Sequence, residues 1–510
     1  MYKCLFLLLF CLSARLFALP TPSLIYSTLD PTSVTQHFAF YELYSQTPEG
    51  KQALKHAWAL LNGNQTQEDP ALIWPSIDIK PIIAFVNRSS QEKSIALNEE
   101  QLSIIEKLGK HLGNRKLKGY SVWSLEETLK LPSDELDLAR ALFLAEKNKE
   151  DSFPLKARSY EANIDLMALQ ILARLPDNPS PEQKVRAIND YIFNEMRFRF
   201  PPHSLYAKDI DMYTLLPSVL DSRRGVCLGV SILYLCLAQR LELSLEAITP
   251  PGHIYVRYVD PQGEITNIET TARGIDIPSE QYLGLETKQL QRRTIREVVG
   301  LAFMNQAAVS WHREDPATAI KLYEQGKLFL PDDYLINMFL GFNYLFIGEE
   351  AKGRKLLESI QGVIPEHSIS ADTVSEDYLL GHIDAEGIQA IYSEVNESRT
   401  SILAKQKRIA DTLAKHPLFR QGHFHLAVTW LQLGRYKEAL PILEHYISLC
   451  PSDPSANYYL AAIYAERLNY TQADRHLKAA EHLVHTQNHH PRALKELRQG
   501  LERICPEPSA

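Results

Sequence analysis

The amino-acid sequence predicts an α+β protein, in which a central helix packs on an antiparallel sheet between an N-terminal helical region and a C-terminal all-α repeat region. Three observations support this prediction. Residues 223–241 are apolar nearly throughout, which is typical of a helix buried at the centre of a domain. Residues 253–259 alternate in polarity with the period of a strand, and the chain beyond residue 292 repeats itself every 34 residues.

Size and composition are those of a globular protein with more than one domain. A chain of 510 residues is too long for one hydrophobic core, so we expect two or three domains. Hydrophobic residues make up 45% of the chain and charged residues 23%. A net charge of -8 over this length provides no polybasic face, which argues against a nucleic acid as partner.

Residues 1–18 are predicted to be a secretory signal peptide. Lys3 precedes an apolar run over residues 5–12, and Ala14 and Ala18 provide small residues near a cleavage point. We therefore expect an exported protein, periplasmic or secreted. The alternatives are a frayed helix or an uncleaved signal that anchors the protein to a membrane. No later segment has the length of apolar sequence that crosses a bilayer.

The six cysteines do not form a disulfide framework. Two of them belong to the signal segment, where the bulky Phe10 argues against lipid modification of Cys11 and Cys4 has no assigned role. The four that remain after cleavage, without any CxxC pair to suggest zinc, are Cys227, Cys236, Cys450 and Cys505. The first two fall on opposite sides of one helix and are not expected to pair, whereas a pair between the last two stays open.

Residues 19–178 form a predicted helical lead-in region with little chemistry. Apolar residues recur at helical spacing in three segments, 38–61, 99–112 and 125–147, separated by stretches rich in Pro, Asn and Ser. The tryptophans of this region, Trp74 and Trp123, are interpreted as core residues rather than as a ligand platform.

Residues 179–291 form the predicted central domain. Pro181 marks a helix start, and Pro201 with Pro202 ends that helix. Its buried stripe is predicted to contain Val185, Ile188, Tyr191, Ile192 and Met196. A short helix then precedes the sequence RRGVC, which places Cys227 in the first turn of the central helix.

The position of Cys227 makes it a candidate nucleophile. The free N–H groups and the positive end of the dipole at a helix start favour a thiolate over a thiol. The alternative is a small core residue, because free cysteine is among the most buried residue types.

A predicted hairpin follows the central helix. Residues 253–259 form its first strand, the sequence DPQG is turn chemistry, and EITNIET is the returning strand. If Val259 pairs with Gly263 across a three-residue loop, His253 lies directly opposite Glu269 on one face. A register shifted by one residue would turn Glu269 to the other face.

Together, Cys227, His253 and Glu269 predict cysteine-dependent acyl chemistry. The imidazole takes the thiol proton, and the carboxylate fixes the tautomer of the imidazole and stabilises its charged form. The backbone N–H of Cys227, with a second donor that the sequence does not identify, would bind the oxyanion. This chemistry needs no metal or organic cofactor, and the spacing of the three residues matches no familiar zinc pattern. Taken singly, His253 also fits a hydrogen-bonded strand residue, and Glu269 a solvated edge charge.

Residues 292–510 are predicted to be a solenoid of tetratricopeptide repeats rather than unrelated helical hairpins. Pro417 and Pro451 are 34 residues apart, and the same step relates Trp430 to Tyr464. The longer interval that ends at Pro417 predicts a stretched copy whose second helix lies near residues 398–415. A last amphipathic helix over 491–504 would cap the stack through Leu494, Leu497, Leu501 and Ile504.

These motifs resemble the transglutaminase-like superfamily, and more closely its SirB-type group, which joins such a core to tetratricopeptide repeats. The resemblance rests on RRGVCLG, a long buried helix, a strand that begins with GH and a strand that ends in NIETTARG. In the superfamily a Cys begins the central helix, a His opens a strand and an Asp ends the next strand. The resemblance covers residues 180–281 and the repeats, and leaves the segment before Pro179 unexplained.

The resemblance implies a papain-like core in which Cys227 is the nucleophile, His253 the general base and acid, and Glu269 the orienting group. Glu269 replaces the usual Asp, and Tyr255 stands near the histidine where enzymatic members commonly have Trp. Because some SirB-type members lack the cysteine, two functions follow. One is hydrolysis or acyl transfer on a peptide or amide, and the other is a non-catalytic scaffold whose repeat groove binds a peptide or protein.

Overall fold

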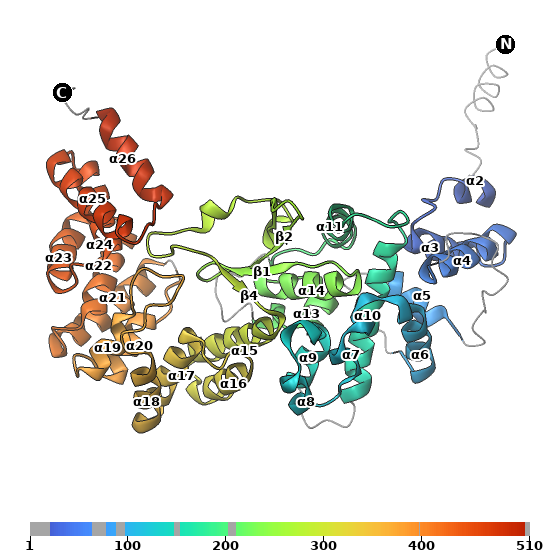
Figure 1. Ribbon diagram of the computed structural model, residues 1–510, viewed down its shortest axis with the longest axis horizontal. Coiled ribbons are helices and arrows are strands. Elements are labelled where there is room, and N and C mark those ends of the chain that lie inside the picture. Colours follow the sequence, from blue (N-terminus) through green and yellow to red (C-terminus); the bar gives the residue numbers. More distant parts are fainter. Residues whose placement is uncertain are drawn as a thin grey trace, which may run out of the picture. The chain divides into compact units, whose positions relative to one another are not determined.

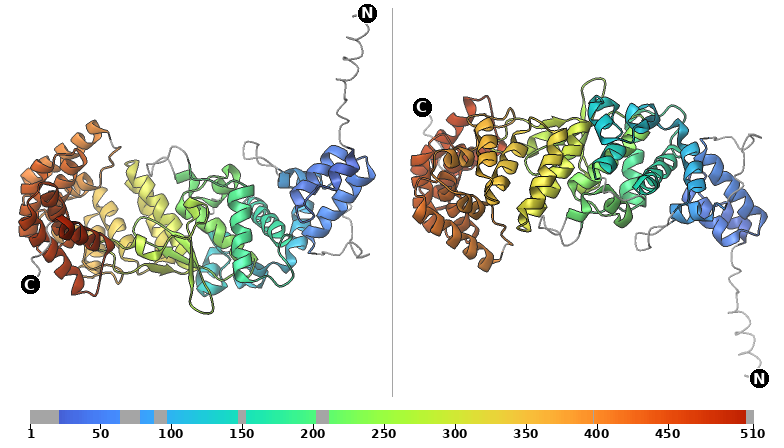
Figure 2. Two further views of the ribbon diagram at one scale, coloured as in Figure 1. Left: turned by 90° about the horizontal axis from the view of Figure 1, so that it is seen from above. Right: turned by 90° about the horizontal axis from the view of Figure 1, so that it is seen from below.

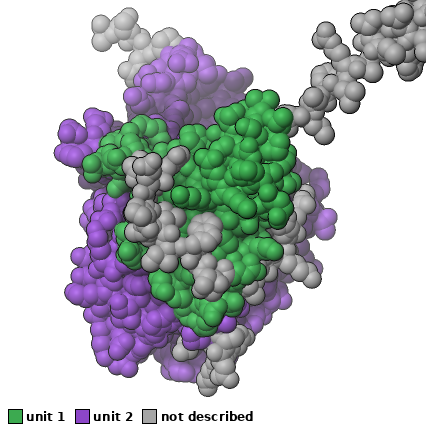
Figure 3. All heavy atoms as spheres, turned by 90° about the vertical axis from the view of Figure 1, so that its right-hand side faces the viewer, with its two compact units in different colours: residues 1–112, 158–187 green, residues 113–157, 188–510 purple. Residues whose placement is uncertain are grey.

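The computed structural model describes residues 21–63, 78–87, 97–146, 153–201, 211–396 and 398–504. The predicted signal peptide with Cys4 and Cys11, and also Trp74 and Cys505, lie outside these ranges. The chain divides into two compact units, coloured separately in Figure 3: Met1–Leu112 with Arg158–Ala187, and Gly113–Ala157 with Ile188–Ala510. No helix in the described ranges has both the length and the apolar character needed to cross a membrane.

The first unit is helical. Its elements are α2 Pro22–Tyr26, α3 Val34–Tyr44, α4 Pro48–Leu61, α5 Lys80–Asn87, α6 Glu99–Leu108 and most of α10 Phe153–Leu172 and α11 Pro181–Asn189. The single helix predicted over residues 38–61 is wrong. The side chain of Thr47 caps α4 by accepting from the N–H of Gly50, and Pro48 has no N–H with which to continue α3.

The second unit begins with short helical segments: η2 Gly113–Lys116, α7 Lys118–Ser121, α8 Leu125–Lys130, η3 Ser133–Glu135 and α9 Leu138–Ala145. The helix predicted over 125–147 is interrupted at Pro132, which favours an extended conformation for the residue before it. Trp123 is not a core residue, because 38% of it is exposed. The guanidinium of Arg140 lies 3.6 Å above its ring.

The central helix matches its prediction. α11 continues as a π-helical turn, η4 Asp190–Glu195, and η5 Asp211–Tyr213 and α13 Leu216–Ser222 precede α14 Cys227–Arg240. The helix that contains α11 ends at Glu195, before the predicted prolines, and Arg197 adopts a left-handed conformation with a φ of 56°. Of the α14 residues, all are buried except Cys227 and Gln239.

The sheet has four antiparallel strands in the order β3-β2-β1-β4, and α14 lies along it (Figure 1). The strands are β1 Glu246–Thr249, β2 Tyr255–Val259, β3 Ile265–Ile268 and β4 Gln291–Arg293. β2 packs against α14, and Tyr255 and Val256 at the start of this strand are fully buried. The fold is therefore α+β, with a small sheet inside a mainly helical chain.

The predicted pairing of Val259 with Gly263 is wrong. Val259 pairs with Ile265, two residues further along, because the loop is longer than predicted. The Asp260 carboxylate accepts from the backbone N–H groups of Gln262 and Glu264 at 2.8 Å, and Gly263 adopts a φ of 87°. A shift of two residues keeps every side chain on its face, since side chains alternate with a period of two.

The C-terminal helices are tetratricopeptide repeats. They are α15 Ile295–His312, α16 Pro316–Phe329, α17 Tyr334–Phe346, α18 Glu350–Ile360, α19 Thr373–Leu379, α20 Ala385–Tyr392, α21 Arg399–Lys415, α22 Arg420–Gln432, α23 Tyr436–Leu449, α24 Pro454–Glu466, α25 Tyr470–His485 and α26 Arg492–Ile504. Consecutive helices pack as hairpins, which follow one another from yellow to red in Figure 2. The period is confirmed, since α22 and α24 begin 34 residues apart.

The irregular copy and the last helix also lie where the sequence places them. Ser398 caps α21 by accepting from the N–H of Ser401, so this helix occupies the predicted range. In α26, Leu494 and Leu501 are buried in the last hydrophobic cluster and Leu497 packs against it, but Ile504 is 60% exposed. Three of the four predicted apolar contacts of this helix are therefore made.

Gly229 allows α14 to approach the segment before it. A methyl group at this position would lie 2.3 Å from the carbonyl oxygen of Tyr213 and 2.8 Å from a methyl carbon of Val219. We expect Gly229→Ala to lower the free energy of unfolding by about 1–3 kcal/mol, because the overpacked backbone has to move. Urea denaturation followed by circular dichroism measures this change.

The matched control is Gly500→Ala. This glycine lies inside α26, and a methyl group there would meet no atom within 4 Å. The control is expected to raise stability by about 0.5–1 kcal/mol, through helix propensity alone. Equal effects of the two substitutions would contradict the close approach at Gly229.

Candidate functional site

Cys227 is the first residue of α14, after the N-cap residue Val226. No side chain caps this helix end, so the positive end of the helix dipole is directed at the thiol. Cys227 is half-buried, whereas Cys236 and Cys450 are buried. Within the described ranges none of the three forms a disulfide, as expected for Cys227 with Cys236. Among the described cysteines, Cys227 is thus the most accessible to a substrate.

A tight turn presents His253. The N–H of His253 donates to the carbonyl of Pro250 at 3.1 Å, Pro251 occupies the second position of the turn and Gly252 the third, with a φ of 69°. This is the sequence and conformation of a type II turn. His253 therefore precedes β2, which begins at Tyr255, rather than lying in the strand as predicted.

Glu269 follows β3 and is 3% exposed. Its Oε2 lies 2.7 Å from Nε2 of His253 and accepts from the hydroxyl of Tyr282 at 2.6 Å. Its Oε1 accepts from the backbone N–H of Thr271 at 3.0 Å and from the Thr271 hydroxyl at 2.5 Å. The side chain of Glu269, which is longer than the usual Asp, is therefore accommodated with hydrogen-bond partners at both carboxylate oxygens.

The turn after Glu269 is tied to the start of the central helix. The hydroxyls of Thr270 and Ser231 are 3.0 Å apart, and the Thr270 hydroxyl donates to the carbonyl of Cys227 at 3.5 Å. The carboxylate and the thiol are therefore held by one local network, although 42 residues separate them in the sequence.

The charges of His253 and Glu269 stabilise each other. Burial alone lowers the pKa of His253, but hydrogen bonds to Cys227 and Glu269 and the negative charges of these groups outweigh burial and raise that pKa to about 10. Burial alone raises the pKa of Glu269, but hydrogen bonds from His253, Thr271 and Tyr282 lower it to about 2. Near neutral pH the pair is therefore an imidazolium and a carboxylate.

The orientation of the imidazole follows from these contacts. Nε2 of His253 is engaged by Glu269, so Nδ1 is the ring nitrogen that stays available to the thiol of Cys227. The structure thus brings together all three residues that the sequence singled out. The oxyanion donors stay a prediction.

Sequence reasoning missed the aromatic support of this site. The ring of Tyr282 stacks between those of His253 and Tyr255, with centroid distances of 5.9 and 4.7 Å. Arg257 donates to the hydroxyls of Tyr255 and Ser279 at 2.9 and 3.0 Å. Tyr282 lies in the short helical turn η7 Ser279–Tyr282, and no motif distinguishes it from the other tyrosines of the chain.

Tyr282→Phe tests the role of this hydroxyl. The ring stack is kept, but Glu269 loses one donor, so we expect the pKa of Glu269 to rise. The acidic limb of the pH dependence of Cys227 alkylation is expected to move to higher pH. Tyr255→Phe is the control, because the Tyr255 hydroxyl contacts Arg257 rather than Glu269. A limb that moves equally in both variants would contradict this role.

Cys227 and His253 open onto a cavity of about 450 Å³, named here the thiol cavity. Its walls are Cys227, Leu228, Thr249, Pro250, Pro251, Gly252, His253, Ile254, Gln291, Arg293, Leu301, Met304, Asn305, Ala308, Tyr323, Leu335, Phe339 and His367. Glu269 lies behind His253 and is not part of these walls. Within the described ranges, no three His, Cys, Asp or Glu side chains are arranged to hold a metal ion.

Comparison with known proteins identifies the domain that contains this site. Residues 158–316, less than a third of the chain, match the family model of the Transglutaminase-like superfamily. The match includes Cys227, His253 and Glu269. No curated protein matches the chain at a significant level.

Solved structures with similar helical arrangements include tetratricopeptide proteins. MamA of MSR-1 is 18% identical over 37% of this chain and 98% of its own, with a TM-score of 0.19. TTC0263, a thermophilic TPR protein of Thermus thermophilus, is 15% identical over 40% and 97%, with a TM-score of 0.20. The APC/C hetero-tetramer Cut9-Hcn1 is 12% identical over 94% and 91%, with a TM-score of 0.21. Likeness at this level supports no conclusion about function.

Proposed function

We propose, from the transglutaminase-like domain at residues 158–316 and the tetratricopeptide repeats that follow, that this protein is an exported enzyme of cysteine-dependent acyl chemistry. Its substrate is a peptide or another amide. The main supporting observation is the 2.7 Å contact between His253 and the buried Glu269, beside a half-buried Cys227 at a helix start. The SirB-type resemblance and the signal sequence support the same assignment.

In the proposed reaction, the sulfur of Cys227 attacks the carbonyl carbon of the substrate amide. The proton of the Cys227 thiol already lies on His253, which is an imidazolium near neutral pH, so the sulfur attacks as the thiolate and the carbonyl π-electrons move onto oxygen. When the tetrahedral intermediate collapses, the C–N bond breaks, His253 protonates the leaving amine and a thioester remains on Cys227. Water or a second amine then attacks the thioester, its proton passes to the neutral His253, and the sulfur leaves as the thiolate beside the imidazolium.

Glu269 has two roles in this scheme. It holds Nε2 of His253, which directs Nδ1 toward the thiol, and its charge stabilises the imidazolium, both in the resting pair and after the attack on the thioester. The neighbouring Tyr282 and Thr271 keep the carboxylate ionised by donating to it.

The proposal is tested by trapping the thioester. The full chain without its first 18 residues is incubated with a library of peptide esters, quenched in acid and digested for mass spectrometry. We expect an acyl group on Cys227 that disappears on adding an amine, with formation of the peptide amide. A chain that acquires no acyl group and turns over no member of the library contradicts the proposal.

A non-catalytic scaffold is the second candidate function. A concave region of about 670 Å³ is lined by residues from α17, α19, α22 and α23 and from the loops between the repeats. Such a groove between repeats is where an extended peptide binds in solenoid proteins. Under this function, a peptide partner would bind equally well to the wild type and to a chain without the Cys227 thiol.

A further inference from the structure

The thiol cavity has two walls of different origin within the second unit. One wall contains Cys227 and the turn that presents His253. The opposite wall is built from helices of the first two repeats: α15, α16 and α17. The repeats are therefore part of the surroundings of the thiol, rather than a separate module joined to the domain.

The repeat wall presents apolar stripes to the cavity. Leu301, Met304 and Ala308 are spaced three and four residues apart, so they share one face of α15. All three are half-buried, as are Leu335 and Phe339 on α17. A helix of a folded protein normally buries such a stripe against a neighbour. Here the stripes border a cavity of about 450 Å³, next to the thiol.

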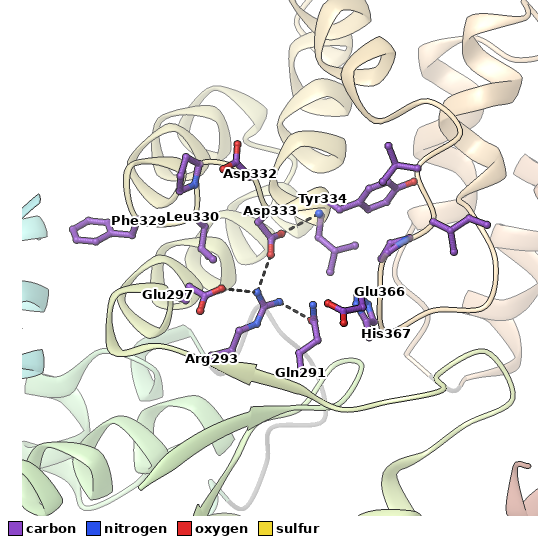
Figure 4. A pocket seen from close by; sticks show the side chains of 15 residues that line it. Gln291, Arg293, Glu297, Phe329, Leu330, Asp332, Asp333, Tyr334, Glu366 and His367 are labelled. Carbon is purple, nitrogen blue, oxygen red and sulfur yellow. Dashed lines mark hydrogen bonds and ion pairs between the residues drawn. The ribbon is translucent and has the colours of Figure 1, made fainter. Parts of the chain in front are cut away.

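The charged groups of the cavity wall are neutralised within the protein. The side chain of Arg293 is 8% exposed and forms ion pairs with Asp333 at 3.1 Å and Glu297 at 3.2 Å. It also donates to Gln291 at 2.7 Å, as Figure 4 shows. Burial, and then the charge of Arg293, lower the pKa of His367, so this imidazole is neutral near pH 7. A charged ligand group would thus find no counter-ion on the repeat wall.

Two polar groups that line the thiol cavity lack partners, one on α16 and one in the segment between α18 and α19. The Tyr323 hydroxyl and Nδ1 of His367 are buried and have no hydrogen-bond partner among the described residues. Both residues line the thiol cavity, and Tyr323 is fully buried. Buried polar groups are nearly always hydrogen-bonded in native proteins, so a bound ligand is a natural source of the missing partners.

We propose that the thiol cavity is the acyl-donor pocket, and that the first two repeats select an uncharged, mainly apolar side chain beside the carbonyl that Cys227 attacks. This inference rests on the proposed function. The substrate is a peptide segment whose apolar side chain lies against the α15 and α17 stripes. A neutral polar group of the same segment hydrogen-bonds to His367 or Tyr323.

Two alkylating probes of equal length test this proposal: hexyl iodoacetamide and its analogue that ends in a carboxylate. In both, the sulfur of Cys227 forms a bond to carbon as iodide leaves, so only the tail differs. We expect Cys227 of the full chain to react about tenfold faster with the hexyl probe, a preference of about 1.4 kcal/mol. Peptide mass spectrometry with time measures both rates, and the slower reaction of free glutathione corrects for intrinsic reactivity.

Two variants locate the preference at the repeat wall. Ala308→Trp fills the cavity and is expected to reduce the rate ratio of hexyl to carboxylate probe to about one, because the apolar area is no longer available. Ala351→Trp, on the exposed face of α18, is the matched control and keeps the ratio of the wild type. Met304→Lys is expected to accelerate the carboxylate probe, a gain that misfolding does not produce.

The outcomes distinguish this inference from the proposed function. If Cys227 reacts quickly with both probes but the ratio is near one, or Met304→Lys does not change it, the apolar pocket is refuted and the acyl chemistry is not. If Cys227 reacts no faster than Cys450 with either probe, the proposed function itself fails. A preference that disappears in Ala351→Trp as well would also refute the pocket.

Discussion

Replacing Cys227 by alanine is expected to lower turnover of any peptide ester or amide substrate by at least about 10³-fold, because no other group can form the thioester. The described part of the chain holds two further cysteines, but both are buried, and Cys236 lies on the far side of the same helix. The rate of product release from the best member of the ester library measures this effect.

Cys236→Ala is the matched control, since it removes one sulfur from the same helix at a position that is fully buried. It is expected to keep turnover within about twofold of the wild type, because Cys236 does not line the thiol cavity. Turnover that survives in Cys227→Ala would overturn the enzyme proposal and leave the scaffold function, with binding at the repeat groove.

Replacing Glu269 by glutamine is expected to lower turnover on the order of 10³-fold, although the shape of the side chain is kept. The glutamine amide donates to Nε2 of His253, which forces the neutral ring to carry its proton on Nδ1. That nitrogen then has no lone pair for the thiol proton. The substitution also removes the negative charge of the carboxylate that contacts the imidazolium and stabilises it.

The pH dependence of turnover follows the same argument. The pKa of His253 is raised to about 10, partly by Glu269, so the basic limb of the wild-type profile is expected at high pH. Removing a negative charge favours the neutral ring, so the limb in Glu269→Gln moves to lower pH. A stopped-flow pH series over the two proteins measures both limbs. An unmoved basic limb would contradict the role of the carboxylate.

The stability of the two proteins changes with pH in a related way. The pKa of His253 rises on folding from an ordinary value of 6.5. The contribution of His253 to the free energy of unfolding is therefore complete below about pH 6.5 and is lost as the pH rises toward 10. The pKa of Glu269 falls on folding from an ordinary value of 4.5. The contribution of Glu269 to the free energy of unfolding is therefore complete above about pH 4.5 and is lost as the pH falls toward 2. The wild type should therefore exceed Glu269→Gln in unfolding free energy most clearly between pH 4.5 and 6.5.

The candidate site was predictable from sequence because each of its three residues follows a local element with a recognisable pattern. Cys227 begins an apolar helix, His253 precedes an alternating strand, and Glu269 directly follows the next strand. The predicted hairpin register was wrong by two residues, but each side chain was assigned to the correct face of the sheet. A register error of an even number of residues leaves every side chain on its face, whereas an odd error moves it to the other face. The stacked Tyr282 had no such local pattern.

The sequence alone determined the order of the elements, the apolar central helix and the 34-residue period, because periodicity and turn chemistry act between residues close in the chain. Only the tertiary structure decided which tyrosine supports Glu269, how long the hairpin loop is, and that the first two repeats form a wall of the thiol cavity. The wall depends on packing between segments separated by tens of residues. The support of Glu269 depends on a contact with a residue 13 positions along the chain, and the loop on the contacts that Asp260 makes inside the turn. Such packing depends on shape and volume at each contact, and a single sequence does not encode these in any pattern of its own.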